Sequence, residues 1–541
     1  MMITCFEQAV HSHKKIKLNK DITMTLQIYR FFMGIILFFG TILTVHCENI
    51  PVDIHGFLSQ GFLQTDRGEY MGKTDDGTFK FNEVGLNVTS NLTDDIHLGI
   101  QFISRKMVNY GENFSKIDWA FADYRWRDFL GFRFGKIKMP FGLYNEIRDI
   151  DMLRTSILLP SSLYNESWRD TLTSLEGVGI YGNIFIEQLG NINYQALSGQ
   201  LDVSCDGGVA GYIEHNGMVE ISKIEPRNSY MASILWDLPI EGISIGSSYI
   251  STKMYETSMT TDHSVYGPIR LGMDITDQLP DQFSQVVVGK TGDINTASMI
   301  SKNFTDIIVP QGIQSLNNKW PKESFRDHHT LDFWVLSFKY QWQDLNISAE
   351  RMDFKINNDW ILAESGYNLR KNNPCWHIIS YYISGTYRLL EWLELGAYYS
   401  VFYENDAQKE AEFYQSLNQS EYYQYPIETI YQQSSQGIRQ NFKNYANAVF
   451  AQTGSGVTLS DDDVENIQLK PDYELEKIKY HDYNGWFKEL VFSLNTQINS
   501  QWNFKMEGHF IDGVTLLDWT VNGGDIPRKR FLFASKVTFN F

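Results

Sequence analysis

Hydrophobic and polar residues alternate, one by one, along the last segment of the chain. One parity holds Phe531, Phe533, Val537, Phe539 and Phe541, and the other holds Leu532, Ala534, Lys536, Thr538 and Asn540. Successive side chains of a strand point to opposite faces, so this period of two predicts a β-strand with one apolar face. Such a strand is typical of a barrel wall in lipid, which turns apolar residues outward and polar residues inward.

The two preceding segments repeat this pattern with charged residues. Trp502, Phe504, Met506 and Phe510 alternate with Asn503, Lys505, Glu507 and His509, and Leu490, Phe492, Leu494 and Ile498 oppose Ser493, Asn495 and Gln497. Charged groups between large aromatic residues would make a poor soluble core, because buried charges need partners. They fit a water-filled lumen, and we expect Lys505 and Glu507 to line it.

The same pattern upstream predicts thirteen more strands. They lie near residues 52–65, 79–89, 95–107, 115–126, 131–138, 175–187, 191–201, 229–238, 243–256, 330–342, 345–356, 376–388 and 393–403. With the last three segments this makes about sixteen strands, which belongs to the even-numbered series of bacterial outer-membrane barrels. The predicted fold is therefore an all-β, transmembrane antiparallel barrel.

Short and long connections alternate along the predicted strands. Short links occur near residues 91–94, 127–130, 188–190, 239–242, 343–344, 389–392 and 499–500, and a long link follows each. A meandering transmembrane barrel has short periplasmic turns and long extracellular loops. Trp126, Trp342, Trp392 and Trp502 stand beside short turns, as expected of rings at a membrane–water boundary.

One apolar run near the N-terminus has a different character. Residues 31–45 are apolar and follow Arg30, and a run of roughly 15 residues is short for a helical span. Its position and flanks indicate the core of a secretory signal peptide. We expect a cleaved signal peptide over residues 1–47, with Met24 as a candidate true start, and a single barrel over residues 48–541.

The chain is acidic, with a formal net charge of −19. This balance disfavours nucleic acid as a partner, because phosphates require a basic footprint. No nucleophile elbow, HExxH or P-loop pattern occurs, so we expect no enzyme activity, no metal site and no cofactor. Cys205 and Cys375 have no metal-binding or disulfide-framework spacing, and their pairing is left open.

Two predicted external loops are very long, at residues 257–329 and 404–485. The second loop is strongly acidic and includes the run Asp461-Asp462-Asp463. Clustered carboxylates suit hard cations, but no EF-hand spacing follows this run. We therefore interpret the segment as a solvated acidic loop.

The third long connection, residues 140–174, is the candidate constriction. From residue 131 to residue 170 the chain has six basic and five acidic residues, so the region is nearly neutral within an acidic protein. Charges of both signs across a narrow pore can set selectivity, although a loop braced by its own ion pairs gives the same pattern. The predicted pore-lining and constriction residues are Arg105, Arg133, Lys136, Lys138, Glu146, Arg148, Asp149, Asp151, Arg154, Lys505 and Glu507.

Three motifs resemble a known group of proteins. Residues 131–143, Gly-Phe-Arg-Phe-Gly-Lys-Ile-Lys-Met-Pro-Phe-Gly-Leu, and residues 54–62, Ile-His-Gly-Phe-Leu-Ser-Gln-Gly-Phe, resemble the phosphate-selective porin O/P and DcaP-like families. The alternate residues Val537, Phe539 and Phe541 are similar to the signal read by the barrel-assembly machinery. The resemblance implies homotrimeric diffusion channels whose third loop folds into the pore. Phosphate-selective members rely on a run of basic pore residues, whereas here acidic residues interrupt it.

These patterns together predict an exported outer-membrane porin. We expect small hydrophilic solutes to diffuse passively through its lumen, past an inward-folded third loop. The alternative is a surface enzyme or adhesin that uses the barrel as an anchor and acts through its long extracellular loops. A secreted, soluble, sugar-binding β-protein is a third possibility, and detergent-free extraction from membranes would identify it.

Overall fold

The structure is a computed structural model. It describes residues 51–111, 113, 115–205, 207–217, 219–261, 268–308, 324–363, 376–404, 421–467, 482–517, 522 and 527–541. The predicted signal peptide and Cys375 lie outside these residues, while Cys205 is half-buried.

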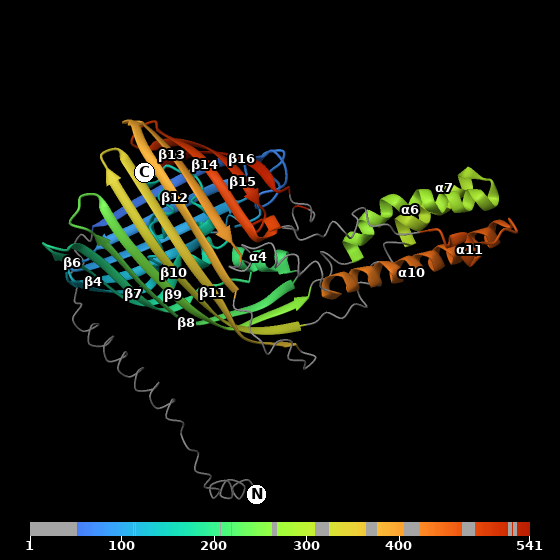
Figure 1. Cartoon of the computed structure of the whole chain (residues 1–541), viewed down its shortest axis with the longest axis horizontal. Coiled ribbons are helices and arrows are strands. Elements are labelled where there is room, and N and C mark those ends of the chain that lie inside the picture. Colours follow the sequence, from blue (N-terminus) through green and yellow to red (C-terminus); the bar gives the residue numbers. More distant parts are fainter. Residues whose placement is uncertain are drawn as a thin grey trace, which may run out of the picture. The chain divides into compact units, whose positions relative to one another are not determined.

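Sixteen strands form one closed antiparallel barrel (Figure 1). They are β1 Val52–Thr65, β2 Phe81–Asn91, β3 Ile96–Met107, β4 Lys116–Arg127, β5 Leu130–Lys138, β6 Ser174–Ile186, β7 Gly190–Leu201, β8 Val219–Asp237, β9 Ile243–Thr261, β10 Ser324–Trp342, β11 Leu345–Ala363, β12 Trp376–Leu390, β13 Leu393–Tyr403, β14 Trp486–Gln497, β15 Trp502–Gly513 and β16 Lys529–Asn540. Each strand pairs with its neighbours in sequence, and β1 pairs with β16. The predicted fold class and strand positions are confirmed.

The two ends of the barrel wall meet at a glycine. Gly56 and Phe541 exchange backbone hydrogen bonds of 2.9 and 3.0 Å. A Cβ atom on Gly56 would lie 2.5 Å from the Phe541 ring, so this position leaves room for the ring only when it has no side chain. Val537, on the same strand face as Phe541, is also exposed.

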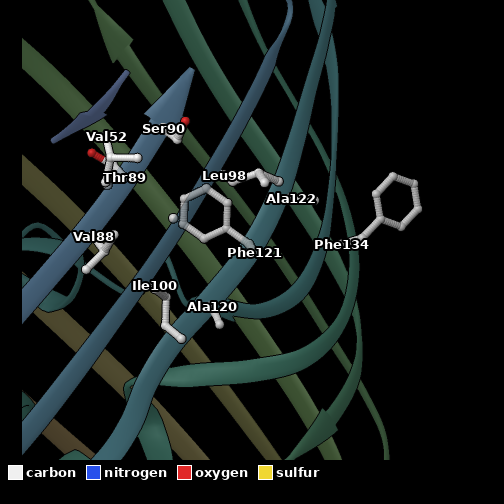
Figure 2. Close-up of a pocket in the computed structure, with 11 residues that line it drawn as sticks. Val52, Val88, Thr89, Ser90, Leu98, Ile100, Ala120, Phe121, Ala122 and Phe134 are labelled. Atoms are coloured by element: carbon white, nitrogen blue, oxygen red, sulfur yellow. The ribbon is translucent and has the colours of Figure 1, made fainter. Parts of the chain in front are cut away.

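The outer face of the barrel is apolar. On β10, for example, Trp334, Leu336 and Phe338 are exposed while the residues between them are buried. Figure 2 shows a shallow hollow in this face, where β4 contributes Ala120 and Ala122 beside larger side chains. Because hydrocarbon is the environment that favours a continuous apolar band around a closed barrel, this is a transmembrane barrel.

Four strands, β8 to β11, are longer than the sequence predicts. Each has 19 residues, whereas about 9–11 suffice to cross a bilayer. The added parts are mostly polar, such as residues 219–228, where the alternation breaks after Ser222 and the pairing with β9 contains register shifts. Alternation is imposed only where lipid covers the wall, so the sequence signal ends before the strands do.

The long connections carry the helical elements. They are η1 Asn145–Ile147, η2 Asp151–Leu153, α2 Ser161–Tyr164, α3 Arg169–Leu172, α4 Gly208–Gly217, α6 Pro268–Thr291, α7 Ile294–Asn303, η3 Phe304–Ile308, α10 Glu421–Thr453, α11 Asp461–Val464 and η6 Asp482–Gly485. None of the helices in the described part of the chain is both long enough and apolar enough to cross a bilayer.

The two longest connections fold together, which corrects the expectation of plain loops. We call α6, α7, η3, α10 and α11 the helical unit. Its buried apolar core takes residues from both connections: Leu279, Phe283, Val287, Ala297, Ile300, Phe304, Phe442, Ala446, Phe450, Leu459, Val464 and Ile467. The rings of Phe283 and Phe442 stack with centroids 4.1 Å apart.

The acidic run Asp461-Asp462-Asp463 has a structural role in the helical unit. Ser460 and Asp463 form a capping box at the start of α11, and carboxylates at a helix start offset its unpaired N–H groups. Asp461 pairs with Lys443 at 2.5 Å and Asp463 with Lys290 at 2.9 Å. Within the described residues, no group of three His, Cys, Asp or Glu side chains could hold a metal ion.

Candidate functional site

A loop bound inside the barrel is the candidate site. We call residues 139–173, between β5 and β6, the inner loop. Its buried apolar side chains are Met139, Phe141, Ile157, Leu158, Leu159, Leu163, Tyr164 and Leu172. They share one apolar cluster with residues from most strands, including Leu63, Phe81, Leu175, Met231, Ile250, Phe333, Val335, Met352, Ile378, Phe402, Phe487, Ile511 and Leu532.

This cluster corrects the expectation that inward positions are polar throughout. Phe333 and Val335, on the face of β10 opposite its exposed residues, are buried against the cluster. At this level the barrel interior is packed by hydrophobic contacts with the inner loop. The inner loop therefore packs against inward-facing side chains of the wall.

The start of the inner loop is fixed to β11 through Glu350. This carboxylate accepts hydrogen bonds from Leu143 N at 2.9 Å, from Tyr382 Oη at 2.7 Å and from Tyr164 Oη. Burial beside Glu350 raises the pKa of Tyr164 well above its ordinary value, so its hydroxyl remains a donor. Gly142 has φ +59°, and a Cβ atom there would lie 2.3 Å from Tyr164 Oη.

A second anchor joins Asp151 to β15 and β16. Its carboxylate lies 3.3 Å from both Lys505 Nζ and Lys536 Nζ, and it accepts a 2.6 Å hydrogen bond from Thr538. Burial opposes ionisation of Asp151, but Lys505, Lys536 and Arg154 outweigh it and hold the pKa below its ordinary value. Arg154 also pairs with Asp151 at 3.2 Å.

Two wall residues predicted to face water instead bind the backbone of the inner loop. Lys505 is fully buried and donates to the carbonyl oxygens of Asp151 at 2.5 Å and Arg154 at 2.7 Å. Glu507 accepts from Ile157 N at 2.6 Å and Leu158 N at 3.0 Å. Polar inward positions on this strand thus satisfy peptide groups that would otherwise be buried without partners.

The neighbouring strand adds a third carboxylate. Glu489 on β14 accepts from Ser161 N at 2.8 Å. His509 lies between the two acids, with Nδ1 3.4 Å from Glu489 and Nε2 3.1 Å from Glu507. All three side chains are buried.

Arginine and carboxylate groups hold the end of the inner loop. Glu166 pairs with Arg105 of β3 at 2.6 Å and with Arg148 at 3.1 Å. Burial opposes ionisation of Glu166, but these two arginines hold its pKa below the ordinary value. Arg169 lies 3.7 Å from Asp118 of β4.

Lys138 and Asp149 form the anchor nearest to β5. Lys138 donates to Asp149 at 2.6 Å and to the Glu146 carbonyl at 2.8 Å, and Gln101 donates to Asp149 at 2.6 Å. Burial opposes ionisation of Asp149, but Lys138 holds its pKa below the ordinary value. Burial raises the pKa of Glu146, whose carboxylate accepts a weak 3.4 Å bond from Gln195 of β7.

Two of the predicted site residues make no contact with the inner loop among the hydrogen bonds and ion pairs described. Arg133 pairs with Asp123 at 2.9 Å. Lys136 pairs with Asp202 at 2.8 Å. The other nine predicted residues lie in the inner loop or bond to it, although the sequence predicted a role in lining the pore rather than in anchoring the loop.

The sequence analysis did not name as site residues several partners that complete these anchors: Asp118, Glu166, Arg169, Glu350, Glu489, His509, Lys536 and Thr538. Their inward parity on a strand, or their place within the third connection, is the signal that could have found them. The contacts themselves join positions up to 387 residues apart, which no local pattern can reveal.

Wall and loop together define a class of structure: a closed, sixteen-stranded transmembrane barrel with a loop packed against inward-facing wall residues. Comparison with solved structures gives similarity to OmpT, an outer membrane protein of Vibrio cholerae, at 9% identity over 91% of this chain and 100% of that chain, with a TM-score of 0.44 for its loop L8 deletion mutant. The outer membrane channel DcaP of Acinetobacter baumannii is similar at 9% identity over 91% and 98% of the two chains, with a TM-score of 0.44.

An anion-selective porin from Comamonas acidovorans is similar at 8% identity over 91% and 100% of the two chains, with a TM-score of 0.42. A scan against protein-family models found no match, and a search of curated protein sequences found none either.

Proposed function

We propose that the protein is an outer-membrane channel for passive diffusion of small hydrophilic solutes, with the inner loop as its constriction. The observation that carries this proposal is the closed wall of sixteen strands with an apolar outer face. Barrels of about 16–18 strands are wide enough to leave an aqueous channel. Passage through such a channel requires no covalent chemistry.

The inner loop makes this a narrow channel. Its anchors reach wall residues on opposite sides of the barrel, such as Gln101 on β3 and Glu350 on β11. Solutes would pass between the loop and the wall, so we expect a unit conductance well below that of an unobstructed barrel of this size. Displacement of the loop would widen the passage.

The topology supports an orientation in the membrane. We infer that the short turns lie in the periplasm and the long connections outside the cell, as in other barrels of this kind. Val537, Phe539 and Phe541 would then form the signal for the barrel-assembly machinery. A homotrimer in outer-membrane lipid, reached through signal-peptide export, completes the proposal.

Single-channel recording tests the proposal directly. The purified, folded protein should produce discrete conductance steps in planar bilayers, and a pure, folded preparation without steps would contradict the channel function. Reversal potential in a salt gradient then reports the sign of the field in the pore.

The helical unit favours a second candidate function, a surface-binding protein anchored by the barrel. Passive diffusion through the barrel does not require an apolar core shared by two distant connections. Deleting residues 268–308 and 421–467 together should abolish surface binding and retain conductance if this second function holds. Loss of conductance with the same deletion would argue against it.

A further inference from the structure

A cluster of two carboxylates and one histidine holds the tip of the inner loop. We call Glu489, Glu507 and His509 the latch. Glu507 binds the N–H groups of two consecutive inner-loop residues, and Glu489 binds a third N–H group three residues further on. The two carboxylates of the latch thus bind backbone N–H groups of the inner loop rather than its side chains.

The contacts of His509 indicate the protonation state of its imidazole ring. Each ring nitrogen faces a carboxylate oxygen, at 3.4 Å for Nδ1 and 3.1 Å for Nε2. A carboxylate only accepts hydrogen bonds, and a neutral imidazole has one donor and one acceptor nitrogen. Both contacts are therefore favourable only when His509 is the doubly protonated imidazolium, whose charge also separates the two acids.

We propose that the latch is a pH-dependent gate, in which deprotonation of His509 loosens the tip of the inner loop and opens the channel at alkaline pH. This inference rests on the proposed channel function. Loss of the proton turns one of the two contacts from a charge-assisted hydrogen bond into a repulsion between a ring lone pair and a carboxylate. Glu489 and Glu507 then also repel each other in a buried site, where charges are weakly screened.

Within the described residues, the hydrogen bonds and ion pairs of the latch include no positive group other than His509. Tyr398 of β13 contacts the imidazole edge-on, with ring centroids 6.4 Å apart, and donates to Leu158 O at 3.4 Å. Burial and the nearby Glu489 carboxylate raise the pKa of Tyr70, which lies in the β1–β2 connection. Arg154 is paired with Asp151.

The experiment compares H509Q with a matched histidine control, H97Q. His97 on β3 lies near a short turn and bonds Asn91 at 2.8 Å. A reporter, T155C, places a thiol in a buried part of the inner loop beside the latch, in a chain whose other cysteines are serine. The labelling rate of T155C is divided at each pH by that of the same thiol in the unfolded protein, because only the thiolate reacts and its fraction rises with pH. This corrected labelling rate and the single-channel open probability are measured from about pH 5 to about pH 10, which extends past the ordinary titration of histidine.

In the wild-type background and in H97Q, labelling rate and open probability should both rise at least about tenfold with pH, since losing a charge-assisted hydrogen bond shifts an equilibrium by that factor. In H509Q both should be high and independent of pH. A flat wild-type labelling profile, or an unchanged pH response in H509Q, would overturn the gate.

The two readouts separate the gate from the channel. A labelling rate that rises with pH in a protein without conductance steps would support the latch and contradict the proposed function. If H509Q does not reach the folded barrel, judged by its far-UV strand spectrum, E507Q tests the same latch. It removes one carboxylate and should likewise abolish the pH response, whereas a retained response would overturn the gate.

Discussion

The inner loop and the helical unit are both built from long connections, yet different forces hold them. The inner loop is anchored to the barrel wall by charged and hydrogen-bonded groups such as Asp151, Glu166 and Glu507. The helical unit is held mainly by the stacked and packed rings of its own core. Ion pairs depend on pH and on each partner, whereas hydrophobic packing depends on buried area.

This difference predicts which kind of substitution affects each region. A loop bound by buried charges can be weakened by changing one charge, because the remaining buried groups are then incompletely compensated. A packed helical core responds to loss of volume instead. We therefore expect the channel to respond to charge changes at the inner loop and the helical unit to respond to core truncation.

The largest effect should follow removal of a wall charge that binds the inner loop. Lys505→Met removes one of the three cations paired with Asp151 and leaves two carbonyl groups without their fully buried donor. Since each buried acceptor left unsatisfied costs about 1–3 kcal/mol, binding of the loop should weaken by about 3–5 kcal/mol. We expect a higher conductance and faster T155C labelling. Lys136→Met is the control, because Asp202 is largely exposed and such surface pairs contribute only about 0–1 kcal/mol. Equal behaviour of the two variants would show that the charge anchors do not hold the loop.

A core truncation should affect the helical unit as strongly and leave the channel unchanged. Phe442 is fully buried and stacks on Phe283, so Phe442→Ala should lower the free energy of unfolding of the helical unit by about 3–5 kcal/mol. Thermal melting of the far-UV helix signal measures this change. Met299→Ala, at a residue 47% exposed, should have little effect. A changed single-channel conductance in Phe442→Ala would mean that the helical unit and the inner loop are coupled.

The strands were predictable because their signal is local and imposed by lipid. The apolar lumen was not, because an inward apolar residue beside an outward one erases the alternation: in Phe333-Trp334-Val335-Leu336, buried and exposed residues are equally apolar. The helices of the helical unit could have been predicted, because Phe442, Ala446 and Phe450 recur at helical spacing. The contact partners of the inner loop could not, because Leu143 and Glu350 meet across 207 residues.

Lowering the pH should weaken binding of the inner loop gradually and leave the helical unit folded, a smaller effect than that of the substitutions above. The pKa values of Glu166 and Asp149 lie below their ordinary values of 4.5 and 3.8, so their contribution to loop binding is complete above those values. It is lost as pH falls below them, through the lowered pKa values of the folded protein. T155C labelling should therefore accelerate in acid while the far-UV helix signal persists. Parallel loss of both signals would show that global unfolding precedes release of the loop.

The smallest effect should come from the cap of α11, which tests whether polar contacts matter in the helical unit at all. Ser460 and Asp463 exchange capping contacts at this helix start, and loss of a serine N-cap typically costs about 1 kcal/mol. Ser460→Ala should lower the melting temperature of the helix signal slightly, with T155C labelling unaffected, because no charge of the inner loop changes. Salt should not alter the difference between wild type and variant much, since a short-range cap is screened less than separated surface charges. A loss as large as that of Phe442→Ala would contradict the comparison, because it would mean that polar contacts rather than the apolar core hold this unit together.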